Sequence, residues 1–214
     1  MNIPRRLFRV WLGPKRIAPI YEGWWKEFQD MHPRWDCVTL RDDSVERLLP
    51  SGSELRALFN GQATWAGRSD ILRVAALDAD GGVYVDHDCL PLRPLDPLLG
   101  DPRPFAGKRS GKSLNNSVIG SPANHPAVRA LLTRFPSWRW GEQSVDPRGP
   151  LLLTETWWNR DDVRLLPIEA FYSENRNFKT AVERRAVERT FAERSFPDGA
   201  YLCHWSSHQY GNTR

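Results

Sequence analysis

The stretch SDILRVAALDADGGVYVDHD, residues 69–88, decides how this chain is expected to fold. Apolar residues such as Ile71, Val74 and Ala75 recur at helical spacing, and Thr64 stands where it can cap the start of the helix. Gly81-Gly82 then stop the helix, and the following VYVDHD is typical of a short strand. A helix that turns directly into a strand indicates an α/β protein.

Two carboxylates stand at the end of this strand. Asp86 and Asp88 project to the same side, because residues i and i+2 of a strand share a face. The carboxyl ends of parallel strands are where open α/β sheets bind ligands, and two carboxylates there can hold Mg²⁺ or Mn²⁺ while substrate phosphates complete the shell. The same alternation points His87 away from the metal. Because loops are rich in Asp, the pair alone leaves a solvated turn as an open alternative.

The helix before the strand adds two charged residues. Asp70 and Arg73 are three positions apart and therefore lie on one helical face. They form either a local ion pair or part of a site, in which Arg73 faces phosphate and Asp70 faces a ligand hydroxyl. A Gly-Gly turn between helix and strand would bring these two residues to the same crevice as Asp86 and Asp88.

The rest of the chain repeats the alternation of helix and strand. Strands are expected at 6–13, 35–40, 117–121, 163–168 and within 200–210, and helices at 17–32, 42–49, 53–60, 125–135, 149–159 and 181–196. The segment 91–115 is rich in Pro, Gly and Arg, so we expect it to be long and irregular. The pattern predicts one domain over residues 1–214, with a mostly parallel central sheet flanked by helices.

The composition narrows the class of protein. With 214 residues, 40% hydrophobic and 26% charged, the chain is typical of a globular domain. The net charge of +4 is spread along the chain without a basic block, so no nucleic-acid partner is expected. Cys37, Cys89 and Cys203 show no CxxC spacing, which favours a reducing compartment over a disulfide scaffold or zinc cage. No signal peptide or membrane span is evident, so a cytoplasmic protein is expected.

Several motifs together resemble those of a known family. The order A-x-x-S-D-x-x-R followed by G-G-x-Y-x-D-x-D is similar to that of the DxD sugar transferases of glycosyltransferase family 32. IPRRLFRVWLG (3–13) resembles the opening of that family, NNSVIGSPANHP (115–126) and Gly149-Pro150 its middle segments, and YLCHWSSHQY (201–210) its closing H-x-W segment. The resemblance covers nearly the whole chain in the same order. It implies a GT-A type, Rossmann-like nucleotide-diphospho-sugar transferase fold.

The resemblance also implies roles for the four residues of the helix and strand. Asp86 and Asp88 match the DxD motif and would hold a divalent metal, Mn²⁺ or Mg²⁺, on the diphosphate of the donor, with Asp88 as the direct ligand. Asp70 matches a residue that grips sugar or ribose hydroxyls. Arg73 matches one that approaches the donor sugar and phosphates. Asp70, Arg73 and Asp88 are therefore the expected catalytic residues.

Three further donor-binding residues follow from the resemblance. Trp11 matches the position at the end of the first strand where the base stacks, although a core residue there is an open alternative. Asn116 lies in the segment that lines the donor-sugar pocket, but it could also satisfy backbone groups in a turn. His204 matches the late His of the family and would contact either the metal or the diphosphate.

Two positions depart from the family pattern. Phe8 stands where the family has an early His, which puts any role of that position in doubt. His208 and Tyr210 occupy the region where a second Trp is common.

The expected function is metal-dependent transfer of a sugar from a UDP- or GDP-sugar to the hydroxyl of a glycan, lipid-linked or protein acceptor. The resemblance implies retention of configuration, and we expect front-face attack because no carboxylate is evident as a nucleophile. Peripheral membrane association stays open, and loops 91–115, 136–149 and 171–180 are expected to set specificity. The alternatives are a metal-dependent phosphohydrolase or nuclease, and a non-catalytic module that binds sugar nucleotides or glycans.

Overall fold

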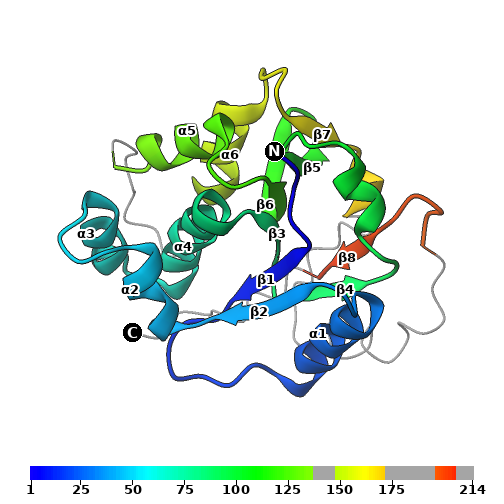
Figure 1. Cartoon of the computed structure of the whole chain (residues 1–214), viewed down its shortest axis with the longest axis horizontal. Coiled ribbons are helices and arrows are strands. Elements are labelled where there is room, and N and C mark those ends of the chain that lie inside the picture. The colour runs from blue at the N-terminus through cyan, green and yellow to red at the C-terminus, as the bar shows by residue number, and fades with distance from the viewer. Residues whose placement is uncertain (137–147, 172–195, 206–214) are drawn as a thin grey trace.

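The computed structural model describes residues 1–136, 148–171 and 196–205 (Figure 1). The strands are β1 (Arg6–Val10), β2 (Asp36–Leu40), β3 (Gly82–Val85), β4 (Cys89–Pro91), β5 (Phe105–Ser110), β6 (Ser113–Ser121), β7 (Arg164–Leu166) and β8 (Leu202–His204). The α-helices are α1 (Pro19–Met31), α2 (Val45–Leu48), α3 (Glu54–Gly61), α4 (Trp65–Asp80), α5 (Pro126–Arg134) and α6 (Arg148–Trp157). Short 3-10 helices cover Asp42–Ser44, Asp96–Gly100 and Ile168–Ala170.

Six strands form the central sheet, in the order β2-β1-β3-β6-β5-β7. The pairs β1–β2, β1–β3 and β5–β7 are parallel, whereas β3–β6 and β5–β6 are antiparallel. The predicted mostly parallel sheet is therefore confirmed, with an antiparallel insertion at β6. A second sheet pairs only β4 with β8.

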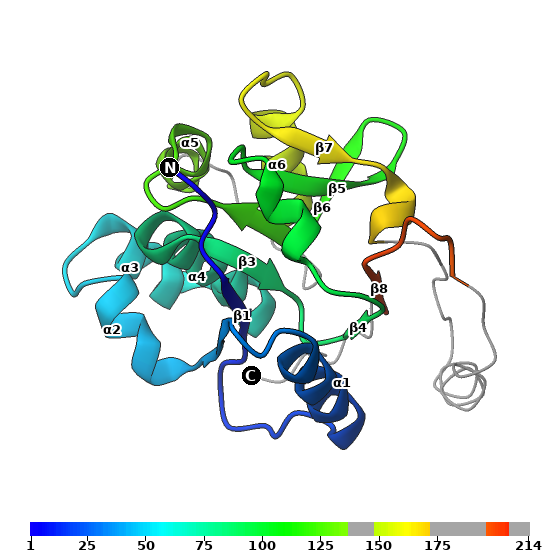
Figure 2. The same ribbon diagram turned by 45° about the vertical axis from the view of Figure 1, so that its right-hand side comes forward.

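Helices cover both faces of the sheet (Figure 2). Alternate residues of β1 show the division, because Phe8 packs into the same hydrophobic cluster as residues of α4, α5 and α6. Leu7 packs on the opposite face with Trp25 and Phe28 of α1. Helix α1 also contacts β4, the strand that follows β3 in the chain. Helix α1 therefore lies near the carboxyl end of β3.

Helix α4 is fixed at both ends by the residues that the sequence indicates. The hydroxyl of Thr64 accepts a hydrogen bond from the Gly67 N–H at 3.1 Å, which caps the first turn. Gly81 ends the helix with φ of +68°, and a Cβ there would lie 2.6 Å from the Ala123 nitrogen. The polypeptide therefore enters β3 immediately, with Gly82–Val85 fully buried.

The prediction of an irregular segment over 91–115 is wrong for residues 105–115, whereas residues 92–104 contain only one short 3-10 helix. This segment holds the end of β4, the strand β5 and the start of β6. Gly111, with φ of +48°, is the first residue of the two-residue turn between paired Ser110 and Ser113. Gly at this position is typical of a tight hairpin turn, so the glycine that suggested irregularity instead joins two strands.

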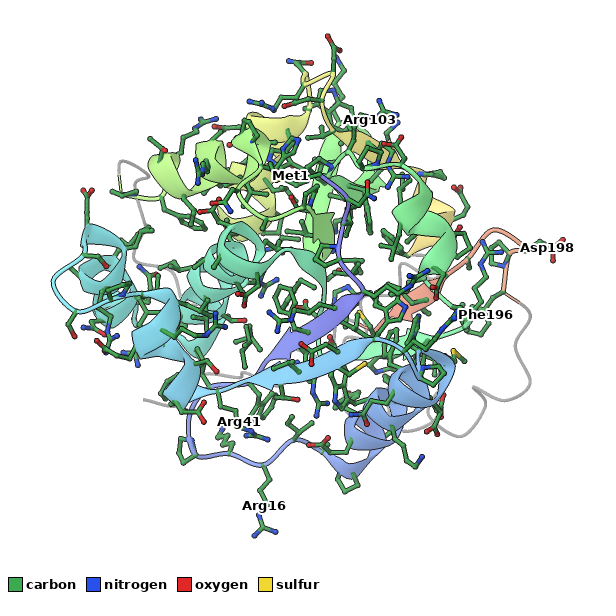
Figure 3. All side chains as sticks on the ribbon, in the orientation of Figure 1. Met1, Arg16, Arg41, Arg103, Phe196 and Asp198 are labelled. Carbon is green, nitrogen blue, oxygen red and sulfur yellow. The ribbon has the colours of Figure 1, made fainter. Side chains whose placement is uncertain are left out.

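Most other expected elements are present, with strand ends that differ by a few residues. The predicted helix 181–196 lies outside the described residues, as do most of loops 136–149 and 171–180 and the chain after 205. None of the described helices is both long and apolar enough to cross a membrane. Exposed charged side chains such as Arg16, Arg103 and Asp198 project outward around the periphery (Figure 3).

Candidate metal centre

Two neighbouring aspartates and one distant histidine come together at the carboxyl end of β3. His204 Nε2 lies 3.5 Å from Asp86 Oδ2 and 3.4 Å from Asp88 Oδ1. One ligand atom from each residue can be chosen so that all lie within 4.8 Å of one another. Two carboxylates and an imidazole are suitable ligands for a divalent first-row metal. The structure thus brings together the three residues that the sequence analysis proposed as metal ligands.

His204 reaches the aspartates through the small β4–β8 sheet (Figures 1 and 2). Cys89, directly after Asp88, pairs with His204 in antiparallel register. The backbone N–H of Trp205 donates to the carbonyl of Asp88 at 2.9 Å. The position of His204 is therefore set by backbone pairing next to the aspartates.

Arg73 connects the helix to the strand. Its Nη2 lies 3.0 Å from Asp70 Oδ1, and its Nη1 lies 3.2 Å from Asp86 Oδ1. The guanidinium lies 4.4 Å from the centre of the Tyr84 ring, and the Tyr84 hydroxyl donates a hydrogen bond to Asp86 Oδ1. Arg73 and Tyr84 thus hold one oxygen of Asp86, and the other oxygen faces His204.

Every nitrogen of the Arg73 guanidinium contacts protein. Besides the two carboxylates, it donates to the carbonyl of Asn116 at 2.8 Å and to the carbonyl and hydroxyl of Ser69 at 3.3 and 3.2 Å. Arg73 is only 5% exposed. In this structure Arg73 is a buried residue that holds the carboxylates of Asp70 and Asp86. Direct contact between Arg73 and a donor remains a prediction.

Asp70 and Asn116 are bonded to each other. Asn116 Nδ2 donates to Asp70 Oδ1 at 2.7 Å, across 46 positions of sequence. Gly149, near the start of α6, is packed against the pair, because a Cβ on it would lie 2.2 Å from Asn116 Nδ2 and 2.4 Å from Asp70 Oδ2. Three segments that are far apart in the sequence therefore meet, and only those of Asp70 and Asn116 were expected near the donor sugar.

The charges of the site are coupled. Burial raises the pKa of Asp86, but the Arg73 charge and the bond with His204 outweigh burial, so its pKa lies below the ordinary value. Burial lowers the pKa of His204, but Asp88 and Asp86 outweigh it and raise that pKa to about 10. Without a metal, a protonated His204 therefore supplies the positive charge that the two carboxylates attract.

His87 is not part of the metal group, as predicted, but the reason differs: β3 ends at Val85, and residues 86–88 form a turn in place of the predicted strand. Its ring packs edge-on against Trp11, with ring centres 4.8 Å apart, and against Tyr21 at 5.4 Å. Burial lowers the pKa of His87. It is therefore a packing residue and not a member of the metal group.

Trp11 lies immediately after β1 and is 3% exposed. Its indole N–H donates to the carbonyl of Lys15 at 2.6 Å. The proposed stacking on a nucleotide base remains a prediction, since the described residues bury this ring against His87.

The sequence analysis missed three residues of the site. Tyr84 could have been found from strand alternation, because it shares a side with Asp86. Ser69 stands four positions before Arg73 on the helix and could also have been found. The close approach of Gly149 to Asp70 depends on tertiary packing and has no local signal.

Comparison with known proteins points to one class. Residues 16–104 match a family described as "Glycosyltransferase sugar-binding region containing DXD motif". The matched range contains Asp70, Arg73, Asp86 and Asp88, whereas Trp11, Asn116 and His204 lie outside it.

Two yeast proteins are similar in sequence. "Inositol phosphoceramide mannosyltransferase 3" of Schizosaccharomyces pombe is 25% identical over 161 residues, which cover 72% of this chain and 45% of the relative. "Mannosyl phosphorylinositol ceramide synthase SUR1" of Saccharomyces cerevisiae is 30% identical over 143 residues, which cover 62% and 37%. The chain thus spans less than half the length of these curated relatives.

Solved structures share the fold at low sequence identity. "PaToxG Glycosyltransferase" has a TM-score of 0.61 and 17% identity, with 73% of this chain and 69% of that chain covered. The apo form of the glycosyltransferase GlyE in Streptococcus pneumoniae TIGR4 has a TM-score of 0.55 and 13% identity, with 96% and 55% covered. These likenesses agree with the α/β sheet and with the GT-A type of fold.

Proposed function

We propose, from the premise that this chain is a family 32-like DXD glycosyltransferase with a GT-A fold, that it transfers a sugar from a nucleotide-diphosphate sugar to a hydroxyl acceptor with the help of a divalent metal. The observation that carries the proposal is the convergence of Asp86, Asp88 and His204 at the end of β3. That residues 1–214 form one catalytic domain is part of the same proposal.

The three side chains fit a hard divalent ion. Two ligands about 2.1 Å from an octahedral ion, at right angles to each other, lie about 3 Å apart. The separations of 3.4 and 3.5 Å from His204 Nε2 to the two carboxylates are only slightly wider. Mn²⁺ and Mg²⁺ prefer such carboxylate ligands, and Mn²⁺ also accepts imidazole. A bound ion would supply a Lewis acid for the negative charge on the departing diphosphate.

The neighbouring residues of the chain suit the binding of the donor sugar. Asp70 presents a carboxylate, held by Asn116 and Arg73, that can accept hydrogen bonds from sugar or ribose hydroxyls. Arg73 places a buried positive charge between Asp70 and Asp86 and holds both carboxylates in place. These groups are positioned before any ligand arrives, which lowers the cost of reorganisation during the reaction.

The stereochemistry of transfer belongs to the proposal. We infer retention of configuration by front-face attack, because the resemblance implies retention and we identify no carboxylate nucleophile within residues 1–136, 148–171 and 196–205. Asp70, the carboxylate nearest the proposed sugar position, is 7% exposed and already bonded to Asn116 and Arg73. It is therefore poorly placed to form a covalent bond with the sugar.

The names of the relatives suggest which substrates to test first. Both are named for mannose and for an inositol phosphoceramide, so we propose mannose as the donor sugar and a lipid-linked hydroxyl as the acceptor. A lipid-linked acceptor would bring the chain to a membrane surface. This is consistent with the peripheral membrane association that the sequence analysis left open.

The test is hydrolysis and transfer with a panel of UDP- and GDP-sugars in Mn²⁺. We expect nucleoside diphosphate to be released with one of these donors, and the release to stop in EDTA. Asp86→Asn combined with Asp88→Asn should abolish it, whereas Asp162→Asn, which removes only a surface partner of Arg160, should not.

Three outcomes would contradict the proposal. Full activity in a folded double variant would exclude the metal role of the aspartates. Release of free phosphate or cleavage of nucleic acid would favour a phosphohydrolase or nuclease. Binding of a nucleotide-sugar that is never consumed would favour a non-catalytic module.

A further inference from the structure

We propose that His87, the middle residue of the D-H-D sequence, is a positioning residue that sets the directions of Asp86 and Asp88 by packing of its ring. This inference rests on the proposed metal site and adds to it a residue that neither binds the metal nor faces the donor. His87 is 7% exposed and is not among the residues whose ligand atoms converge, which are Asp86, Asp88 and His204.

The ring of His87 is held between two aromatic side chains. Its plane lies at 72° to Trp11 and at 86° to Tyr21, and the ring centres are 4.8 and 5.4 Å apart. These are edge-to-face contacts, which depend on the orientation of the ring and therefore restrict it. We refer to Trp11 and Tyr21 as the aromatic bracket.

The aromatic bracket is itself fixed to the sheet. The Trp11 indole N–H is bonded to the carbonyl of Lys15 at 2.6 Å. Tyr21 belongs to α1, which is anchored by Arg9 of β1 through an ion pair of 2.5 Å with Glu22 and a hydrogen bond of 3.4 Å to the Tyr21 carbonyl. Arg9 is 2% exposed, whereas the side chain of its partner Glu22 is 44% exposed, so the anchor runs from the interior to the surface. Because Tyr21 contacts His87, the anchoring of α1 also restrains the ring of His87.

The backbone on either side of His87 is also fixed. The N–H of Asp86 donates to the carbonyl of Ser117 at 2.8 Å, and the carbonyl of Asp88 accepts from Trp205 at 2.9 Å. Between these two points the chain makes a turn, closed by the N–H of Cys89, which donates to the carbonyl of Asp86 at 3.2 Å. The buried ring of His87 sets how the two peptides that flank it are oriented within this turn. Because the peptides carry the Cα atoms of both aspartates, the ring determines whether their carboxylates converge on His204.

The role depends on the shape of the ring and not on a proton. His87→Phe keeps a flat ring that fits between Trp11 and Tyr21, whereas His87→Ala removes it. Two variants that both remove the imidazole nitrogens should therefore differ, with Mn²⁺ binding weakened in His87→Ala and nearly unchanged in His87→Phe.

The experiment measures Mn²⁺ affinity of the nucleotide-free protein, with free Mn²⁺ followed by electron paramagnetic resonance. His87→Ala should weaken Mn²⁺ binding about 10–100-fold, as is usual when a residue that orients metal ligands is lost. His87→Phe should stay within about threefold of the wild type. Thermal denaturation in EDTA gives the folded fraction of each variant, so that a loss of fold is not read as a loss of affinity.

His32→Ala is the matched control. His32 is 1% exposed and also packs edge-on against a tryptophan, Trp35, with ring centres 4.7 Å apart. Its ring nitrogens contact the Phe28 carbonyl and the Leu95 N–H, neither of which belongs to the metal group. It should lose stability as well, but its folded fraction should bind Mn²⁺ like the wild type.

Wild-type Mn²⁺ affinity in folded His87→Ala would overturn the inference and leave the proposed function intact. Equal weakening in His87→Phe and His87→Ala would also overturn it, because the nitrogens and not the shape would then matter. If His87→Ala does not fold, Tyr21→Leu removes one side of the bracket and should weaken Mn²⁺ binding in the same direction; unchanged affinity there contradicts the inference. A wild-type protein that binds no Mn²⁺ contradicts the proposed metal site itself.

Discussion

Arg73 is the residue that joins the two halves of the candidate site. Its guanidinium is within 3.2 Å of one carboxylate on the helix and one on the strand, and it lies over the Tyr84 ring. A buried cation with two anionic partners is costly to remove, because each partner would keep a charge in a poorly solvated place. The geometry of Asp70 and Asp86 thus depends on a residue that faces the interior.

Replacement of Arg73 by methionine should therefore lower the free energy of unfolding by about 3–5 kcal/mol in metal-free protein, measured by urea denaturation at neutral pH. The difference in free energy of unfolding between the wild type and Arg73→Met should become smaller as the pH falls below about 4. The lowered pKa of Asp86 contributes stability above the ordinary aspartate value of 3.8, and this contribution is lost as the pH falls through the lower folded value.

Arg129→Met is the control for this prediction. Arg129 pairs with Asp78 at the surface, where its side chain is 58% exposed, so its loss should cost about 1 kcal/mol or less. Equal losses in the two variants would contradict a special role for Arg73.

Individual residues of the site differ in how well the sequence predicts them. The i,i+3 spacing predicted that Asp70 and Arg73 meet, and strand alternation predicted that Asp86 and Asp88 share a side. Both pairs do meet in the fold, but β3 ends at Val85 and residues 86–88 form a turn, so the two aspartates converge through that turn and not through strand alternation. The bond between Asp70 and Asn116 crosses 46 positions and was not predicted, because the family resemblance placed each residue near the donor sugar without joining the two.

At the level of elements, α4 and β3 act as one unit. The Thr64 cap and the Gly81 turn are local signals, so the ends of α4 could be predicted almost to the residue, whereas the strand predicted up to residue 88 ends at Val85. The hairpin β5–β6 could not, because Gly and Pro mark tight turns and irregular loops equally. The three-residue strands β4 and β8 are defined by their pairing and have no hydrophobic pattern of their own.

Helix α6 offers the sharpest test at this scale, because Gly149 brings it against Asp70 and Asn116. In Gly149→Ala the new methyl would lie 2.2 Å from Asn116 Nδ2, so either α6 must shift or Asn116 must release Asp70. We expect a strain of about 1–3 kcal/mol and a donor affinity reduced about tenfold or more, measured by calorimetry with the donor found in the panel.

Gly23→Ala is the matched control for this variant. Gly23 lies within α1, and a Cβ there meets no atom within 4 Å. The change should leave donor binding unaltered and add up to about 1 kcal/mol of stability. Normal donor affinity in Gly149→Ala would show that the close approach has no role in the site.

For the whole molecule, the main feature is that the candidate metal centre joins residues that are more than 100 positions apart in the chain, Asp86 and Asp88 on one side and His204 on the other. Asp86 and Asp88 follow a central strand, whereas His204 arrives from the last described strand by pairing with β4. The α/β class and the parallel pairs could be predicted from alternating patterns. The strand order and the β4–β8 contact could not, because they depend on long-range packing. The extent of the domain over 1–214 stays a prediction.

The central claim is that Asp86, Asp88 and His204 hold a divalent metal against a diphosphate. Calorimetric titration of the wild type with UDP and GDP, in Mn²⁺ and then in EDTA, tests it most directly. We predict that one nucleotide binds at least about tenfold more tightly with Mn²⁺, a difference of about 1.4 kcal/mol, and that His204→Ala removes this gain. Equal affinity in Mn²⁺ and EDTA, or an undiminished gain in His204→Ala, would contradict the claim.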